Sequence, residues 1–136
     1  MTTQAISSRL GELLAERAET EGIAAAWLFG SVARGTAGPR SDVDVGILYS
    51  EEPPGTLSGL GLSLEGELER LLGLPVQLVV LNRAPADLVQ RVLRDGVLLV
   101  DRHRSRRIGF EVRSRKEFWD LEPFLNRYRR LERVPS

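Results

Sequence analysis

Residues 28–48 read LFGSVARGTAGPRSDVDVGIL, and this stretch decides how the chain folds. Its first residues end an unbroken apolar run, Ile23–Phe29, which predicts a buried strand. Gly30 and Ser31 break that run, and Val43–Tyr49 has the composition of a second strand. The stretch therefore predicts two strands. Small residues follow the end of the first strand, and charged residues stand at the start of the second.

Gly30 and Ser31 form the first candidate binding motif in this stretch. A glycine lets the backbone approach a ligand closely, and a serine can cap the short helix expected next. The free N–H groups at such a helix start bind phosphate. Arg34 and Arg40 lie nearby in the sequence and could add positive charge. Taken alone, the pair is also typical of an ordinary capped turn from strand to helix.

The second candidate motif is Asp42-Val43-Asp44, at the start of the second predicted strand. Side chains at i and i+2 leave the same face of a strand, so both carboxylates should point one way. The other face should receive Val43, Val45 and Ile47. Two adjacent carboxylates repel and favour a compensating cation, and Mg²⁺ prefers such oxygen ligands. The alternative is a polar strand entrance whose acids are solvated or paired with an arginine.

The two motifs together indicate phosphoryl transfer. Phosphate donors and a metal site at neighbouring strand ends are what this chemistry requires, because the metal neutralises the charge that develops on the phosphate. Other phosphate-binding signatures are missing from the sequence, which has neither a P-loop nor a Gly-x-Gly-x-x-Gly fingerprint.

Gly30-Ser31, ten intervening residues and Asp42-x-Asp44 resemble the signature of the polymerase-beta-like nucleotidyltransferases. The wider wording, GSVARG followed by SDVD, looks like the minimal nucleotidyltransferase branch, which includes the antitoxin partners of HEPN ribonuclease toxins. The resemblance implies that Gly30 and Ser31 hold the triphosphate of ATP, with Arg34 beside them. It implies that Asp42 and Asp44 bind Mg²⁺ or Mn²⁺. The expected reaction is transfer of AMP to a hydroxyl, with a tyrosine of a HEPN-type partner as acceptor.

One position departs from the family pattern. Members usually carry a third carboxylate on the next core strand, and the matching run here is VQLV, with Gln77 at that position. A glutamine offers a neutral oxygen and cannot act as a general base at neutral pH. Four other acids could substitute in space: Glu51, Glu52, Asp87 and Asp101. Two hypotheses follow, an active transferase and a catalytically weakened nucleotide-binding module that neutralises a partner by direct contact.

The rest of the chain alternates between helical and extended patterns. Helical patterns cover residues 3–21, 57–72, 86–94 and about 104 onward, and strand patterns cover 75–81 and 97–100. Gly109 and Pro123 interrupt the last helical pattern, so one helix or two are equally consistent with it. This order predicts an α+β fold over residues 1–136 as a single domain, with a mixed sheet of about four strands and helices packed on it.

Charge is unevenly distributed over the 136 residues, although the net charge is zero. Residues 102–136 hold 11 basic and 5 acidic side chains, which could meet an acidic partner or a phosphate backbone. A solvated arginine-rich helix is the favoured interpretation, and we do not expect a nucleic-acid partner. Phe118 and Trp119 are expected to anchor this helix or to form part of a protein-binding face.

Cysteine is absent, which excludes disulfides, thiolate metal sites and cysteine nucleophiles and suits a reducing cytoplasm. We expect no signal peptide and no association with a membrane, because the apolar runs are too short to span a bilayer.

Overall fold

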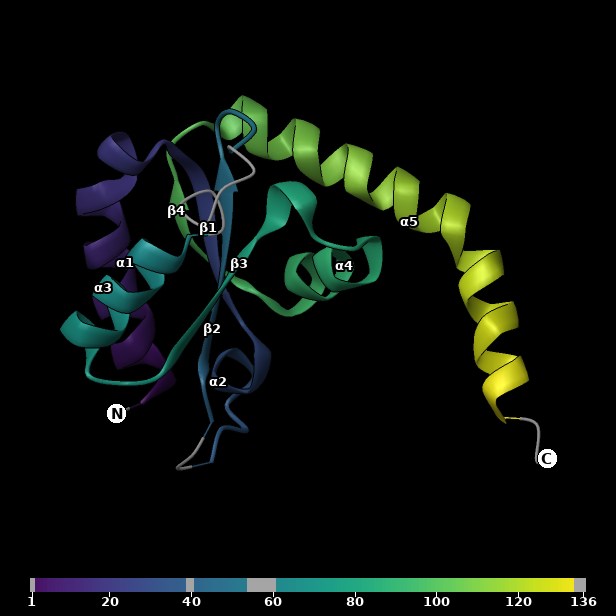
Figure 1. The fold of residues 1–136 in the computed structure, drawn as a ribbon, viewed down its shortest axis with the longest axis horizontal. Coiled ribbons are helices and arrows are strands. Elements are labelled where there is room, and N and C mark those ends of the chain that lie inside the picture. The colour runs from purple at the N-terminus through teal and green to yellow at the C-terminus, as the bar shows by residue number, and fades with distance from the viewer. Residues whose placement is uncertain (1, 39–40, 54–60, 134–136) are drawn as a thin grey trace.

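A computed structural model describes the chain except for residues 1, 39–40, 54–60 and 134–136 (Figure 1). Helices and strands follow one another in the predicted order. The helices are α1 (Thr3–Glu21), α2 (Gly30–Arg34), α3 (Leu62–Leu72), α4 (Ala86–Asp95) and α5 (Arg104–Arg133), with a 3₁₀ turn η2 (Leu81–Arg83). The strands are β1 (Ile23–Phe29), β2 (Val43–Tyr49), β3 (Val76–Val80) and β4 (Val97–Asp101).

The four strands form one mixed sheet in the order β3-β2-β1-β4. β1 pairs antiparallel with both β2 and β4, whereas β2 and β3 are parallel. A parallel pair needs a crossover between its strands, and α3 lies in that crossover. The predicted α+β fold with a mixed sheet of about four strands is therefore confirmed.

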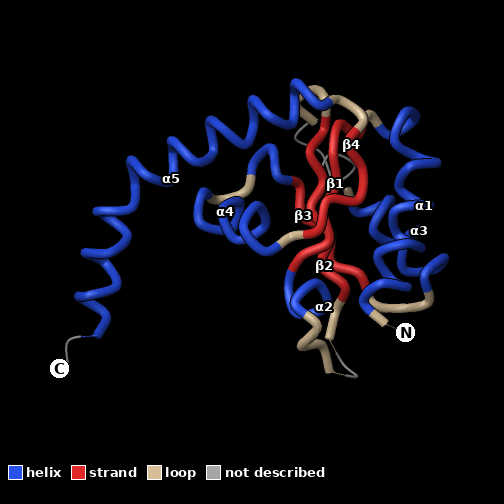
Figure 2. Tube along the Cα trace, turned by 180° about the vertical axis from the view of Figure 1, so that it is seen from behind, coloured by secondary structure: helices blue, strands red, loops and turns tan. Residues whose placement is uncertain are grey.

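Helices cover both faces of the sheet (Figures 1 and 2). On one face, α1 and α3 bury leucines against alternate side chains of the strands. On the other face, α4 and the first part of α5 pack over a second apolar cluster, which contains Ala24, Ala25, Trp27, Leu48, Leu81, Val89, Val92 and Phe110. The period of two along each strand thus divides its side chains between two cores.

β2 shows this division most clearly, and the division decides where the acidic pair emerges. Val43, Val45 and Ile47 are buried in the cluster beneath α1 and α3. Leu48 belongs to the cluster on the opposite face. Because side chains alternate along a strand, Asp44 shares the face of Leu48, which is the face that α4 covers. The predicted separation of the valines from Asp44 is confirmed.

Two helix boundaries resolve or correct the expectations from sequence. α5 continues through both Gly109 and Pro123, so the C-terminal segment is one helix. Its course changes direction in its second half (Figure 1), as a proline inside a helix causes. The helix predicted over 57–72 begins at Leu62, after Gly61 in the left-handed region at φ 75°; residues 57–60 lie outside the described residues.

α5 is the longest helix of the described chain, at 30 residues, and charged side chains recur along it. Within the described ranges, no helix combines the length and the apolar character that crossing a membrane requires.

Candidate functional site

A pocket of about 380 Å³ opens where β1 passes into α2 and α4 lies over the sheet. Its lining residues are Phe29, Gly30, Ser31, Arg34, Asp44, Gln77, Val79, Leu88, Arg91 and Asp95. The structure thus gathers Gly30, Ser31, Arg34, Asp44 and Gln77, five residues that the sequence predicted for one site.

Asp42 is not among the described residues that line this pocket. It directly precedes β2 and is exposed, and of the described acids on this stretch it is Asp44 that lines the pocket. The charge of Asp42 still acts on the Asp44 carboxyl. The two carboxylates are therefore coupled electrostatically, and Asp44 is the one that lines the pocket. Arg40, which the sequence suggested as a second cation, lies outside the described residues.

The strand register fixes the neighbours of Asp44. It lies opposite Phe29 on β1 and opposite Gln77 on β3. Parallel neighbours in register on adjacent strands are next to each other on one sheet face. Gln77 is exposed at the pocket edge. A carboxylate at position 77 would consequently stand beside Asp44, which is where a third acidic side chain could join the pair.

Gly30 brings the backbone directly against the Asp44 carboxylate. Its φ of 76° lies in the left-handed region, and a Cβ built there would overlap Oδ2 of Asp44 and lie 3.0 Å from its Cγ. Only glycine accepts both conditions without strain. Gly30 therefore allows the start of α2 and the acidic side chain to share one small space.

The predicted serine cap is wrong. α2 begins at Gly30, with Phe29 at the cap position and no side-chain cap hydrogen bond, so Ser31 lies inside the helix. The physical reason is the positive φ of Gly30, which turns the strand into the helix one residue earlier than a serine cap requires. Ser31 instead contributes one of the first backbone N–H groups of α2, which have no partner within the helix.

We expect Gly30→Ala to weaken nucleotide binding by about tenfold or more, because the new methyl group must displace Asp44. Gly35→Ala is the matched control. Gly35 also has a left-handed φ, 73°, but a Cβ there meets nothing within 4 Å. Both variants should lose about 1–2 kcal/mol of stability to the strained backbone. Calorimetric titration with ATP and magnesium measures the difference, and equal affinities would show that the Gly30–Asp44 contact does not shape the site.

Electrostatics distinguish the two carboxyls that line the pocket. Burial raises the pKa of the Asp44 carboxyl, Asp42 raises it further, and the positive charge of Arg34 opposes both effects. Asp95 has the opposite shift: a hydrogen bond from Arg94 lowers its pKa, and Arg34 contributes in the same direction. Asp44 is thus the carboxylate whose charge is poorly compensated and that would gain most from a bound cation.

α4 supplies three pocket residues that sequence reasoning missed: Leu88, Arg91 and Asp95. They recur at i, i+3 and i+7 and therefore lie along one side of the helix, next to the buried Val89 and Val92. That spacing was available in the sequence. The missing information was tertiary, because nothing in the pattern says that this helix lies above the end of β1.

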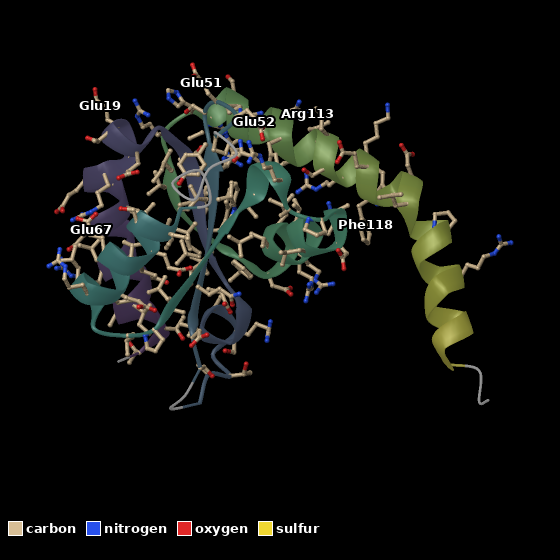
Figure 3. The ribbon with its side chains drawn as sticks, viewed as in Figure 1. Glu19, Glu51, Glu52, Glu67, Arg113 and Phe118 are labelled. Carbon is tan, nitrogen blue, oxygen red and sulfur yellow. The ribbon has the colours of Figure 1, made fainter. Side chains whose placement is uncertain are left out.

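The four acids proposed as substitutes at Gln77 do not reach the pocket. Of the described lining residues, none is Glu51, Glu52, Asp87 or Asp101. Glu51 and Glu52 lie at the end of the sheet away from α2 (Figure 3), and Glu52 pairs with Arg83 at 2.8 Å. Asp101 pairs with Arg107 at 2.9 Å.

The donor set fits a hard divalent cation through few protein ligands. Asp44 and Asp42 offer carboxylate oxygens, and Gln77 adds a neutral amide oxygen beside Asp44. The described residues contain no cluster of three or more acidic, histidine or cysteine side chains that could hold a metal. Mg²⁺ is commonly held by one or two carboxylates together with substrate phosphates and water, and a pocket carboxylate with a second one near it fits that demand.

The fold and the pocket define a nucleotidyltransferase. Residues 12–105 match the family described as "Polymerase beta, Nucleotidyltransferase", and the chain belongs to this family. The resemblance noted in the sequence, carried by Gly30-Ser31 and Asp42-x-Asp44, is thereby confirmed.

Three known proteins show where this chain stands among its relatives. It is 37% identical over 97 residues to "Protein adenylyltransferase MntA" of Thermococcus cleftensis, covering 71% of this chain and 95% of that protein. A toxin–antitoxin crystal structure with AMP-PNP contains a similar chain, with a TM-score of 0.77, 21% identity and coverage of 91% and 98%. A chain in the structure of the tri-AMPylated Shewanella oneidensis HEPN toxin in complex with MNT antitoxin is also similar. Its TM-score is 0.73 at 20% identity, and the match covers 98% of this chain and 100% of that chain. At 21% and 20% identity, the two structural similarities establish a shared fold and nothing more.

Proposed function

We propose that this chain transfers AMP from ATP to a hydroxyl group of a protein partner, a tyrosine of a HEPN-type toxin, and so acts as an antitoxin in the cytoplasm. The observation that carries the proposal is that the start of α2, Arg34 and Asp44 line one and the same pocket. The 37% identity to a protein adenylyltransferase supports the choice of AMP and of a protein acceptor.

Each pocket residue then has a task in the reaction. The N–H groups of Gly30 and Ser31 donate to the triphosphate, and Arg34 and Arg91 balance its charge. Asp44, with the nearby Asp42, would hold Mg²⁺ or Mn²⁺, which when bound neutralises charge on the phosphate oxygens. The acceptor oxygen attacks the α-phosphorus, and the bond from that phosphorus to the pyrophosphate oxygen breaks. Gln77 cannot take the acceptor proton, which passes to water at the pocket mouth.

A second function is favoured by Gln77 itself. A site without an acceptor-activating acid could keep nucleotide binding and lose most of its rate, since general-base help is worth about 10²–10⁴ in rate. The chain would then neutralise its partner by contact alone.

Incubation with ATP labelled at the α-phosphate separates the two functions. The acceptor to test is the product of the gene next to the one that encodes this chain, and we expect that product to be a HEPN-type protein. Magnesium-dependent label on a tyrosine of that protein supports the transferase. A stable complex that forms without any label, even after long incubation, supports the binding module. Omission of the metal is the control.

We expect ATP with magnesium to raise the melting temperature by several degrees, and ATP with EDTA to raise it much less. A ligand at about 100 times its Kd adds about 2.7 kcal/mol to the free energy of unfolding. The metal dependence follows from the poorly compensated charge of Asp44 in the pocket, which Arg34 only partly offsets. Differential scanning fluorimetry makes the comparison, with magnesium alone as the control. Equal shifts with and without metal would contradict a metal-bridged site.

A further inference from the structure

The pocket that contains Asp44 extends across three strands of the sheet. Gly30 begins α2, which follows directly on β1, while Asp44 lies on β2 and Gln77 on β3. Because the strands are ordered β3-β2-β1, Asp44 stands between the start of α2 and the side chain of Gln77. The pocket therefore has one end at α2, where the phosphate donors lie, and an opposite end at β3.

Two apolar side chains line the β3 end of this pocket. Val79 follows Gln77 by two residues on β3, so both side chains leave the same face of the sheet, and both line the pocket. Leu88 of α4 lines the same pocket. Val79 and Leu88 are only partly buried, although both pack against the apolar cluster on this face. Each therefore leaves part of its surface open to the pocket, and we call the two residues the apolar wall.

The course of α4 places Leu88 at the β3 end of the pocket. The chain leaves β3 through η2 and then enters α4. The far end of α4 meets β1, because Val97, directly beyond the helix and its following glycine, pairs with Leu28. Leu88 and Asp95 are separated by two turns of helix, about 10 Å along its axis. The apolar residue that α4 gives to the pocket thus lies toward β3, and the charged Asp95 lies toward β1.

The geometry of phosphoryl transfer assigns the β3 end to the acceptor. The attacking and leaving oxygens lie roughly in line on opposite sides of the phosphorus. In the proposed reaction the leaving pyrophosphate is held at the start of α2, and the α-phosphorus lies at Asp44. The acceptor oxygen must then approach from the side away from α2, which is the side of Gln77 and Val79. The ribose is another substituent of the same phosphorus and projects away from this line, so the nucleoside does not fill the β3 end.

We propose that the apolar wall receives the aromatic ring of the acceptor tyrosine and so selects a phenolic hydroxyl over that of serine or threonine. This inference rests on the proposed function, because it concerns the acceptor in that reaction. The ring gains from contact with Val79 and Leu88, while the hydroxyl at its far end reaches the polar part of the pocket beside Asp44. There the phenolic oxygen forms the bond to the α-phosphorus, its proton passes to water and pyrophosphate leaves. A serine or threonine side chain is too short to cover the wall and loses this contact.

Leu88→Ala tests the apolar wall, and Leu93→Ala is its matched control. Leu93 is also a partly buried residue of α4 that packs against the same cluster, but it is not among the described residues that line the pocket. With labelled ATP, magnesium and the product of the neighbouring gene, Leu88→Ala should lower kcat/KM for transfer by about tenfold or more. Leu93→Ala should leave kcat/KM unchanged, although both variants lose melting temperature. Leu88→Met keeps the apolar volume and should keep transfer.

Titration with a non-hydrolysable ATP analogue and magnesium separates the wall from the nucleotide site. All three variants should bind the analogue as wild type does, because the wall lies at the end of the pocket away from α2. Weaker binding by Leu88→Ala alone would assign the wall to the nucleobase and overturn the inference. In the partner, replacement of the labelled tyrosine by serine should slow transfer by wild type by about tenfold or more, and equal labelling of the serine would overturn the selection.

The outcomes distinguish this inference from the proposed function. If wild type labels the partner and Leu88→Ala labels it equally fast, the wall does not receive the ring and the transferase stands. An equal loss of transfer in Leu93→Ala would trace the effect to the stability of α4 and would also overturn the inference. If wild type does not label that protein, the proposed function fails and the inference fails with it.

Discussion

Asp44→Asn is expected to lower AMP transfer about a thousandfold or more while the protein stays folded. Asparagine keeps the shape of the side chain but removes the negative charge that, in the proposed mechanism, holds the cation. A bound metal contributes several kcal/mol to the stabilisation of transition-state charge, and each 1.36 kcal/mol corresponds to a factor of ten in rate. Steady-state transfer of labelled AMP measures the loss, and titration with ATP and magnesium should show weaker binding.

The same variant should be more stable than wild type when no metal is bound. Because burial and Asp42 raise the pKa of Asp44, the ionised carboxylate destabilises the folded state above that pKa. This destabilisation is lost as the pH falls through the raised pKa towards the usual value near 3.8, below which the carboxyl is protonated in both states. The stability advantage of Asp44→Asn should therefore be present at neutral pH and should close on acidification. Thermal denaturation in EDTA from about pH 7 to about pH 4 follows it.

Asp87→Asn is the control for both measurements. Asp87 lies in the first turn of α4 and is not among the described residues that line the pocket. Its substitution should leave transfer and metal response unchanged. A wild-type rate in Asp44→Asn, or an equal loss in Asp87→Asn, would show that Asp44 has no special part in holding the metal.

Gln77→Asp is expected to raise AMP transfer, by up to about 10²–10⁴ if the new carboxylate serves as a full general base. The register places residue 77 directly beside Asp44 on the neighbouring strand, at the pocket edge. A carboxylate there can accept the proton of the attacking hydroxyl, which the amide of Gln77 cannot do. Single-turnover transfer to the partner measures the gain without interference from product release.

The gain in rate should be accompanied by a loss of stability in the metal-free protein. A third carboxylate would join two that already repel, and magnesium should restore the melting temperature. Gln77→Asn is the matched control, because it shortens the side chain by the same amount without adding charge. If Gln77→Asp changes neither the rate nor the response to magnesium, position 77 does not act in transfer. Equal acceleration by both variants would assign the effect to side-chain length.

Local pattern was enough to predict most of the fold and four of the ten described residues that line the pocket. Gly30, Ser31, Arg34 and Asp44 come from a short stretch whose strand ends are visible in the sequence, so their proximity follows from chain connectivity. Gln77 could be placed beside them only through the resemblance to a family, because strand pairing between distant segments leaves no local signal.

The residues that α4 adds to the pocket could not be predicted in the same way. Arg91 and Asp95 are far along the chain from Asp44, and only the packing of α4 on the sheet brings them near it. The prediction that Ser31 caps α2 was wrong for a related reason. A cap depends on where a helix begins to within one residue, and the left-handed φ of Gly30 shifted that boundary.

The parallel pairing of β2 with β3 has a consequence for the order of folding. The pocket takes residues from β1, α2, β2, β3 and α4, so it does not exist until β3 has paired with β2 across the intervening α3. Contacts between segments so distant in sequence form late, because loop closure must come first. We therefore expect the pocket to be incomplete in the transition state of folding, so that a nucleotide stabilises the native state and not the transition state. Bound nucleotide should prolong the lifetime of the native chain by slowing unfolding, while the rate of refolding stays as it is without ligand.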